Sequence, residues 1–216
     1  MFRMEPGIST PPGGHAAVYD AVMWPFGRAA VGAWRRRLAA RALGRVLEIG
    51  TGTGAQLRWY APGVEVTALE PDATMRERAR RRAARAAART TVVDGRAEDL
   101  PFADASFDVA VSAFALCTVA DPAAALAELC RVLVPGGTLL LLEHVHLRWE
   151  PGRALQTRAA PAWAAVAGGC RLDRDTVRFA REAGFVVLQE HTHVAGWIVE
   201  ACLRSPLGLH GTSTPA

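Results

Sequence analysis

Short apolar runs alternate along the chain with stretches that have the composition of helices. The runs have the length of buried strands. Strands that alternate with helices predict a parallel sheet covered on both faces, which is the α/β fold class. We expect strands at 45–49, 64–69, 91–93, 107–112, 138–144, 185–189 and 196–203, and helices at 28–42, 153–167 and 173–183. A further helix is expected to stop at Pro135-Gly136-Gly137, where the fifth strand begins.

The length of 216 residues and mass of 23.1 kDa fit one domain, which we place at residues 15–204. Residues 1–14 contain three prolines and three glycines and are predicted to be flexible. Residues 205–216 are expected to form a loose tail. We find no apolar run long enough for a transmembrane helix, and residues 1–7 lack the apolar centre of a signal peptide.

A glycine-rich segment follows the first predicted strand. The apolar run ends in Glu48, and Gly50, Gly52 and Gly54 come directly after it, with Thr51 between the first two. Alternating glycines let the backbone turn sharply and let a ligand approach where a side chain would clash. Such a strand–loop–helix unit binds a nucleotide-like cofactor at the carboxyl end of the strand.

The acidic residue before the glycines decides between two cofactor classes. The spacing of the glycines also satisfies the dinucleotide pattern, so the glycines alone leave NAD open. A pyrophosphate is repelled by a carboxylate at Glu48, whereas a cation is attracted. S-Adenosylmethionine (SAM) carries a sulfonium and an ammonium and no phosphate. Glu70 ends the second strand, where a carboxylate can accept both ribose hydroxyls. The sequence therefore predicts SAM.

Several motifs in order resemble the class I SAM-dependent methyltransferases, in the branch of the ubiquinone/menaquinone C-methyltransferases. They are the glycine segment, 64–70, 95–102, 106–112 and 129–140. A closer likeness, to the alkyl thiol S-methyltransferases, is carried by 115–119, 143–145, Trp149, Gln156, 161–163, Gly169-Cys170 and Arg174. The resemblance implies a Rossmann-like, seven-stranded, mostly parallel sheet with helices on both faces and the last strand antiparallel beside the fifth. It also implies lid helices near the N-terminus.

The resemblance and the motifs together give the predicted cofactor-binding residues. They are Tyr19, Glu48, Gly50, Thr51, Gly52, Gly54, Glu70, Pro71, Ala97, Glu98, Ser112 and Cys117. One position departs from the family pattern, because Arg96 stands where an aspartate usually faces the adenine. A guanidinium cannot accept a hydrogen bond from the adenine amino group. Either Glu98 or a backbone carbonyl takes that role, or Arg96 points outward.

His144 is the predicted catalytic residue. It follows the fifth strand at the edge where an acceptor must meet the sulfonium, and an imidazole can take a thiol proton near neutral pH. The alternative is a histidine that only caps the strand. His146, His191 and His193 make His-x-His pairs, but no carboxylate or cysteine cluster accompanies them in the sequence, so no metal site is expected. Cys117 is expected to be a small buried residue, and Cys170 has no base beside it in sequence.

The charge and the cysteine content indicate which binding partners and which cellular setting to expect. The net charge is +4, and arginine takes the place of lysine throughout, with a run at 76–85 in the helix after Glu70. No aromatic residues are interleaved with these arginines, so the run predicts a solvated helix face instead of a nucleic-acid-binding surface. Any contact of the protein with a membrane is expected to be peripheral at most. Four cysteines without a C-x-x-C pair predict a reduced, cytoplasmic setting.

The predicted function is methyl transfer from SAM to a small-molecule acceptor, foremost the sulfur of an apolar thiol. Two alternatives stay open. The acceptor could be the carbon of a quinone, the oxygen of a phenol or the amine of a phospholipid headgroup. In a different class, the protein would bind SAM without catalysis.

Overall fold

The computed structural model describes residues 24–208. Its elements, in chain order, are α2 (Trp24–Ala40), β1 (Arg45–Ile49), the 3-10 helix η1 (Leu57–Trp59), β2 (Glu65–Leu69), α3 (Ala73–Ala83), β3 (Arg89–Val93), β4 (Phe107–Ala113), α4 (Pro122–Val132), β5 (Leu133–His144), α5 (Gly152–Val166), α6 (Thr176–Glu182), β6 (Val186–His193), η2 (Val194–Gly196) and β7 (Ile198–Arg204). No helix within 24–208 is long and apolar enough to cross a bilayer.

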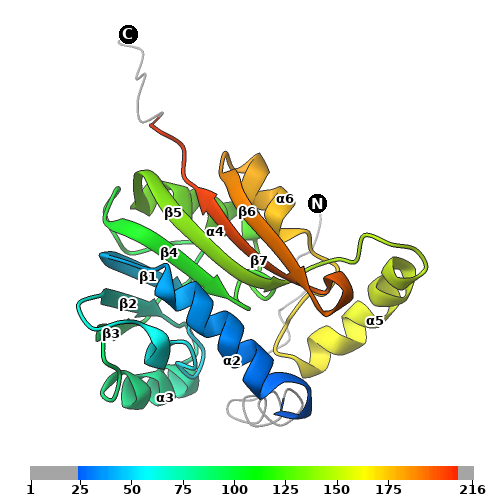
Figure 1. Ribbon diagram of the computed structural model, residues 1–216, viewed down its shortest axis with the longest axis horizontal. Coiled ribbons are helices and arrows are strands. Elements are labelled where there is room, and N and C mark those ends of the chain that lie inside the picture. The colour runs from blue at the N-terminus through cyan, green and yellow to red at the C-terminus, as the bar shows by residue number, and fades with distance from the viewer. Residues whose placement is uncertain (1–23, 209–216) are drawn as a thin grey trace, which may run out of the picture.

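The seven strands form one sheet in the order β3-β2-β1-β4-β5-β7-β6 (Figure 1). The first five are parallel, and β7 lies antiparallel between β5 and β6. The predicted α/β class, the strand count and the antiparallel insertion beside the fifth strand are confirmed. The buried runs are nearly all apolar because helices cover both faces of these strands.

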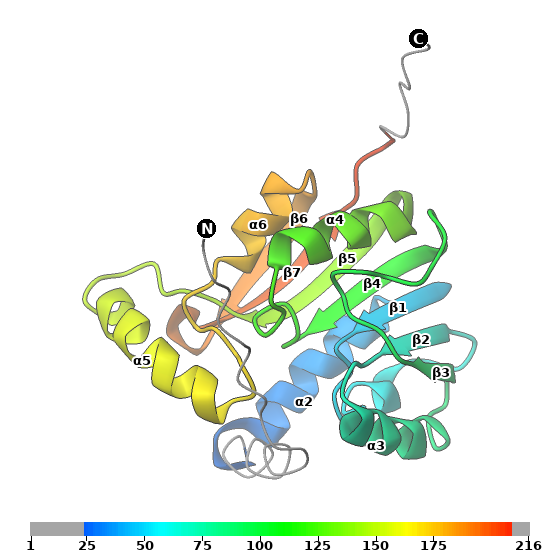
Figure 2. The same ribbon diagram turned by 180° about the vertical axis from the view of Figure 1, so that it is seen from behind.

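Two hydrophobic clusters fill the spaces between the sheet and its helices. The first lies under α4 and α6 and includes Leu126, Leu129 and Val177. The second lies under α2 and α3 on the opposite face and includes Leu38 and Leu57. Figure 1 shows α2 crossing one face of the sheet, and Figure 2 shows α4 and α6 on the other. The predicted helix at 28–42 therefore lies on a face of the sheet. The lid expected near the N-terminus stays a prediction, because residues 1–23 lie outside the described part of the chain.

The α4–β5 junction differs from the expectation. The helix ends at Val132 and the strand begins at once with Leu133, so Pro135 lies inside β5. Leu133 pairs with Phe107 and the next aligned pair is Val109 with Thr138, which leaves 134–137 as an irregular stretch. Proline, which has no N–H to donate, is tolerated in such a bulge.

The first two residues of the expected C-terminal tail are held by β5. Ser205 is buried, its N–H donates to the Gly137 carbonyl, and its hydroxyl donates to the Val134 carbonyl. The Gly136 N–H donates to the Pro206 carbonyl. Ser205 and Pro206 are thus fixed against the irregular stretch of β5.

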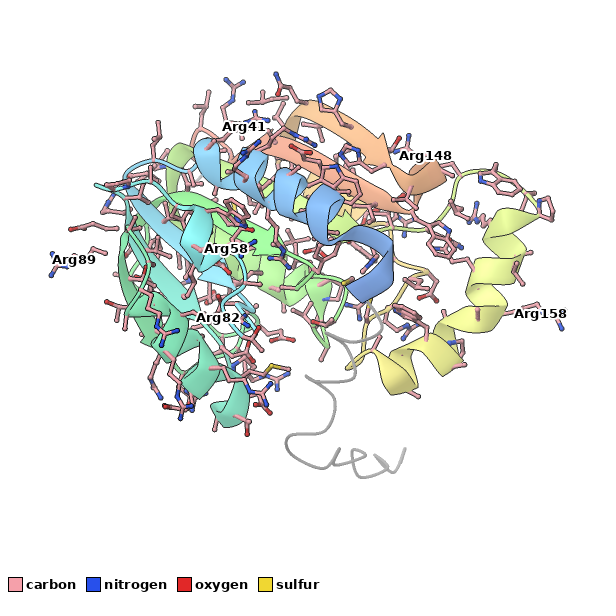
Figure 3. All side chains as sticks on the ribbon, turned by 60° about the horizontal axis from the view of Figure 1, so that its bottom comes forward. Arg41, Arg58, Arg82, Arg89, Arg148 and Arg158 are labelled. Atoms are coloured by element: carbon pink, nitrogen blue, oxygen red, sulfur yellow. The ribbon has the colours of Figure 1, made fainter. Side chains whose placement is uncertain are left out.

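The later part of the arginine run is solvated, as predicted, whereas the Arg76 side chain is 11% exposed and donates to the Glu70 carbonyl. Ala79 is fully buried toward the sheet, whereas Arg80, Arg81 and Arg82 are exposed. Arg89 and Arg158, on other elements, are also exposed and point away from the molecule in Figure 3.

Candidate functional site

The carboxyl ends of β1, β2, β4 and β5 meet at one edge of the sheet. The chain passes from β1 to β2 on one side and returns to β4 on the other, so the strand order reverses beside β1. Ligands of open α/β sheets bind outside the strand ends at such a point. The glycine segment follows β1 directly at this edge.

The three glycines of that segment have different surroundings. All three have positive φ, at 55° for Gly50, 58° for Gly52 and 81° for Gly54. A Cβ on Gly50 would lie 2.6 Å from the Cβ of Ala115, and one on Gly54 would lie 3.1 Å from the Cα of Ala79. A Cβ on Gly52 would meet nothing within 4 Å. The first and last glycines therefore serve close packing, whereas Gly52 faces open space where a ligand can approach.

Glu48 supports this loop from beneath. It is 2% exposed, and its two carboxylate oxygens accept hydrogen bonds from the Thr51 hydroxyl at 2.7 Å and the Tyr60 hydroxyl at 2.8 Å. Burial raises the pKa of Glu48 above its usual value, and these two hydrogen bonds oppose the shift. Glu48 and Thr51 were predicted to contact the cofactor. In the structure the Thr51 hydroxyl donates to Glu48, so both side chains hold the loop in shape, and their contact with the cofactor stays a prediction.

Glu70 lies at the same edge as the loop. The β1–β2 register aligns Ile49 with Leu69, so Gly50 and Glu70 leave the sheet at one level. One Glu70 oxygen accepts from the Gly52 N–H at 2.7 Å and the other from the Asp72 N–H at 3.0 Å. Burial raises the pKa of Glu70. Its carboxylate is thus held beside the open face of Gly52, and the adjacent Pro71 is exposed.

The segment expected near the adenine has a different arrangement. Arg96 is exposed and lies 3.5 Å from a Glu98 oxygen, which also accepts from the Ala120 N–H at 2.8 Å. Arg96 thus points outward, as one of the expected alternatives. Through its hydrogen bond with Ala120, Glu98 holds the loop before α4. Ala97 is buried in the first hydrophobic cluster. The contacts of Ala97 and Glu98 with the cofactor stay predictions.

A buried carboxylate that the sequence did not single out organises the loop after β4. Glu143 is fully buried at the end of β5, and one oxygen accepts from the Ser112 hydroxyl at 2.6 Å and from the N–H groups of Ala115 at 3.0 Å and Leu116 at 3.1 Å. Its other oxygen accepts from the Cys117 N–H at 3.1 Å. Ser112 is therefore part of this network, and its predicted contact with the cofactor stays a prediction.

Cys117, His144 and Cys170 lie together behind that loop. The Nδ1 of His144 is 3.4 Å from the Sγ of Cys170 and 3.9 Å from that of Cys117, and the two sulfurs are 3.5 Å apart. The hydrogen bond with Cys117 and the nearby imidazole lower the pKa of Cys170 to about 5, while the pKa of Cys117 is raised well above its usual value. The expectation that no cysteine cluster accompanies the histidines is wrong for His144. Cys170 has no base beside it in sequence, but the fold brings the His144 imidazole to it.

The other candidates lie elsewhere. Tyr19 is outside the described residues. His146 is 3.0 Å from the Thr157 hydroxyl, and His193 contacts Glu200 at 3.1 Å and stacks on Trp34, so the His-x-His pairs are not joint sites. Arg174, by contrast, lies near the cluster and donates to the Leu116 carbonyl at 2.8 Å.

Residues 47–141 match the family model described as a methyltransferase domain.

The chain contains a methyltransferase domain.

Curated relatives extend the likeness. Thiol S-methyltransferase TMT1B of Rattus norvegicus is 34% identical over 154 residues, which cover 67% of this chain and 61% of that protein. Demethylmenaquinone methyltransferase of Deinococcus radiodurans is 42% identical over 117 residues, covering 51% of this chain and 48% of that protein. The chain thus spans about half to three fifths of these relatives. A crystal structure from Thermotoga maritima, described as a SAM-dependent methyltransferase, has a TM-score of 0.65 at 23% identity and covers 89% of this chain and 100% of its own. It shows the same fold.

The cofactor implied by this methyltransferase domain is SAM, and the residues at the strand ends fit it. Gly52 borders open space that a Cβ would enter, called the cradle below, and the Glu70 carboxylate is held beside it. Gly52 and Glu70 would hold the cofactor, with Pro71 next to them. The buried Glu48 would keep the loop in place. NAD, the other cofactor class considered, would bring a pyrophosphate to this acidic edge.

A pair of glycine substitutions separates ligand contact from packing. We expect Gly52→Ala to weaken SAM binding at least tenfold while lowering the free energy of unfolding by only about 1 kcal/mol, the cost of a strained left-handed residue. Gly50→Ala should cost about 2 kcal/mol in stability, because its Cβ also clashes with Ala115. Calorimetric titration with SAM and urea unfolding measure the two effects. A Gly52→Ala protein that binds SAM as well as the wild type would show that the cofactor does not approach this residue.

Proposed function

We propose that this protein transfers the methyl group of SAM to the sulfur of a small, mostly apolar thiol. The observation that carries the proposal is the likeness to thiol S-methyltransferase TMT1B, which is longer than the domain match at 47–141 and therefore includes residues beyond the cofactor-binding strands. The cradle at Gly52 and the carboxylate of Glu70 support SAM as the donor.

The chemistry asks little of the protein. SAM supplies a methyl group on a sulfonium that is already an activated leaving group. The protein has to align the acceptor with that methyl group and exclude water, which contributes about 7–11 kcal/mol in well-oriented systems. A free thiol is about 3% ionised at pH 7, so a modest electropositive surrounding makes it reactive.

His144 stays the predicted group on the acceptor side. It is the last residue of β5 and its ring packs against Phe114 at 4.7 Å between centroids. A base needs a free nitrogen, and Nδ1 already lies beside two thiols. The hypothesis that His144 takes the proton of the acceptor therefore requires the Nε2 atom.

A carbon acceptor is the second candidate. The identity to demethylmenaquinone methyltransferase is higher, at 42%, but it extends over only 117 residues. This likeness supports the domain and its cofactor more than the acceptor, because it is confined to about half of the chain.

One experiment separates these candidates. The purified chain is incubated with methyl-labelled SAM and, in parallel, with alkane and aryl thiols of graded size, a demethylated quinol, a phenol and phosphatidylethanolamine vesicles. We expect labelled thioethers and an equal amount of S-adenosylhomocysteine, with larger apolar thiols preferred. The Gly52→Ala variant at the same SAM concentration should show the label falling with cofactor binding.

Each other outcome contradicts a different part of the proposal. Label in the quinol, phenol or lipid without any thioether would exclude S-methylation and keep methyl transfer. SAM binding without labelled product from any class would indicate the non-catalytic alternative.

A further inference from the structure

Three potential metal ligands from three separate segments meet behind the loop after β4. Cys117 follows β4, His144 ends β5 and Cys170 follows α5. Each offers one ligand atom, and these atoms all lie within 4.8 Å of one another. The residues are 0%, 5% and 2% exposed, in that order. Two thiols and an imidazole are thus buried together, with one another as polar partners. Apolar packing alone does not explain why three polar groups are placed side by side.

The spacing of the three atoms is that of a tetrahedral zinc site. Zinc bonds of about 2.3 Å to sulfur and about 2.0–2.1 Å to nitrogen place two sulfurs about 3.8 Å apart and a sulfur and a nitrogen about 3.5 Å apart. The observed separations are 3.5 Å between the sulfurs and 3.4 and 3.9 Å from each sulfur to Nδ1. An ion can therefore be inserted with shifts of a few tenths of an ångström.

The donor set selects the class of ion. Two sulfurs and one imidazole nitrogen favour zinc and similar soft or borderline divalent ions, whereas magnesium and calcium prefer oxygen ligands. Two thiolates would also offset the charge of a divalent ion. Among the described residues, no further histidine, cysteine or carboxylate joins the group as a fourth ligand.

Neighbouring contacts fix the ligands independently of one another. The Cys117 N–H donates to Glu143 at 3.1 Å, and its carbonyl accepts from the Arg171 N–H at 2.8 Å. The His144 ring lies against Phe114, and the Cys170 N–H donates to the Ala167 carbonyl at 3.2 Å. Such outer contacts orient ligands in metal sites.

We propose that Cys117, His144 and Cys170 form a three-ligand site for a zinc-class divalent ion. The fourth position is left to water or another small ligand. Three protein ligands with one open position are typical of catalytic zinc sites, and four of structural ones. The site stands on the geometry of these residues. An ion bound to Nδ1 would leave the hydrogen of His144 on Nε2, so the ion-bound protein would not use His144 as the base for an acceptor thiol.

Cobalt(II) tests the site directly. The full chain is reduced, stripped with a chelator and titrated with Co²⁺ without oxygen. We expect one equivalent to bind, with a thiolate-to-cobalt charge-transfer band in the near ultraviolet and the strong visible bands of tetrahedral cobalt. One equivalent of Zn²⁺ should abolish both. Zn²⁺ should also raise the melting temperature in proportion to the logarithm of its concentration.

Variants decide which residues bind. Cys117→Ser, Cys170→Ser and His144→Ala should each weaken cobalt binding at least 100-fold, with folding checked by circular dichroism. Cys202→Ser is the matched control, because Cys202 is a buried free cysteine on β7 outside the cluster. It should bind cobalt like the wild type. Failure of the reduced wild type to bind a stoichiometric ion, or an equal loss in Cys202→Ser, would overturn the proposal.

Discussion

Replacing Glu143 with glutamine is expected to lower the free energy of unfolding by about 3–5 kcal/mol, because buried donors lose a charged partner. The carboxylate accepts from the Ser112 hydroxyl and from three consecutive backbone N–H groups, those of Ala115, Leu116 and Cys117. A glutamine keeps one oxygen and places an NH₂ group against at least one of these donors. Urea unfolding of the purified variant measures the loss.

The control for this prediction is Glu182→Gln. Glu182 is an exposed carboxylate on α6 whose only described ion pair, with Arg178, is 3.6 Å long. Its removal should change stability by less than about 0.5 kcal/mol. A Glu143→Gln protein that loses no more than this control would show that the loop after β4 holds its shape without the carboxylate.

The strand pattern was predictable because it depends on local composition. Strands buried on both faces need continuous apolar runs, so the amino-acid sequence alone places β1 at Arg45 to Ile49. The glycine loop was equally visible, since positive φ and close approach require glycine at 50, 52 and 54. These features also locate the edge of the sheet at which the cofactor is expected to bind, because the carboxyl ends of parallel strands lie at the same edge.

Side-chain direction was not predictable in the same way. Whether Glu48 points at a ligand or at Tyr60 depends on a residue twelve positions away, and Ser112 meets Glu143 across two paired strands. The cysteine–histidine cluster brings together three segments that whole helices and strands separate in the sequence. A signal was present in retrospect: Glu143-His144 at the end of a buried strand is an unusual pair of polar residues in an otherwise apolar run.

Glu70 has a second role beside the one that the sequence predicts. From the sequence it was a ligand for the ribose. In the structure it is first a connector, since its two oxygens join Gly52 to Asp72 at the two sides of the cofactor edge. Removing it therefore removes a ligand contact and loosens the loop that makes the cradle.

Glu70→Ala is accordingly expected to weaken SAM binding by about 2–3 kcal/mol, or about 30- to 150-fold, since two hydrogen bonds to a charged acceptor are lost. Glu65→Ala, at the other end of the same strand, is the matched control. Its carboxylate is exposed and, within residues 24–208, forms an ion pair with Arg89 at 3.4 Å, so SAM affinity should not change. Isothermal titration compares the three proteins. Equal dissociation constants for Glu70→Ala and the wild type would reduce Glu70 to a loop connector.

The pH dependence of binding distinguishes the charge from the shape of this side chain. Burial raises the pKa of Glu70 in the free protein. The ribose hydroxyls need the ionised form as acceptor, so SAM affinity should fall as the pH falls through that raised pKa, earlier than for an ordinary glutamate. The raised pKa also means that ionised Glu70 opposes folding slightly, so acid should not weaken the fold through this group. Glu70→Gln keeps the shape without the titration. Its affinity should be low and independent of pH over the range in which the wild type weakens, and a parallel decline in both proteins would assign the pH effect to another group.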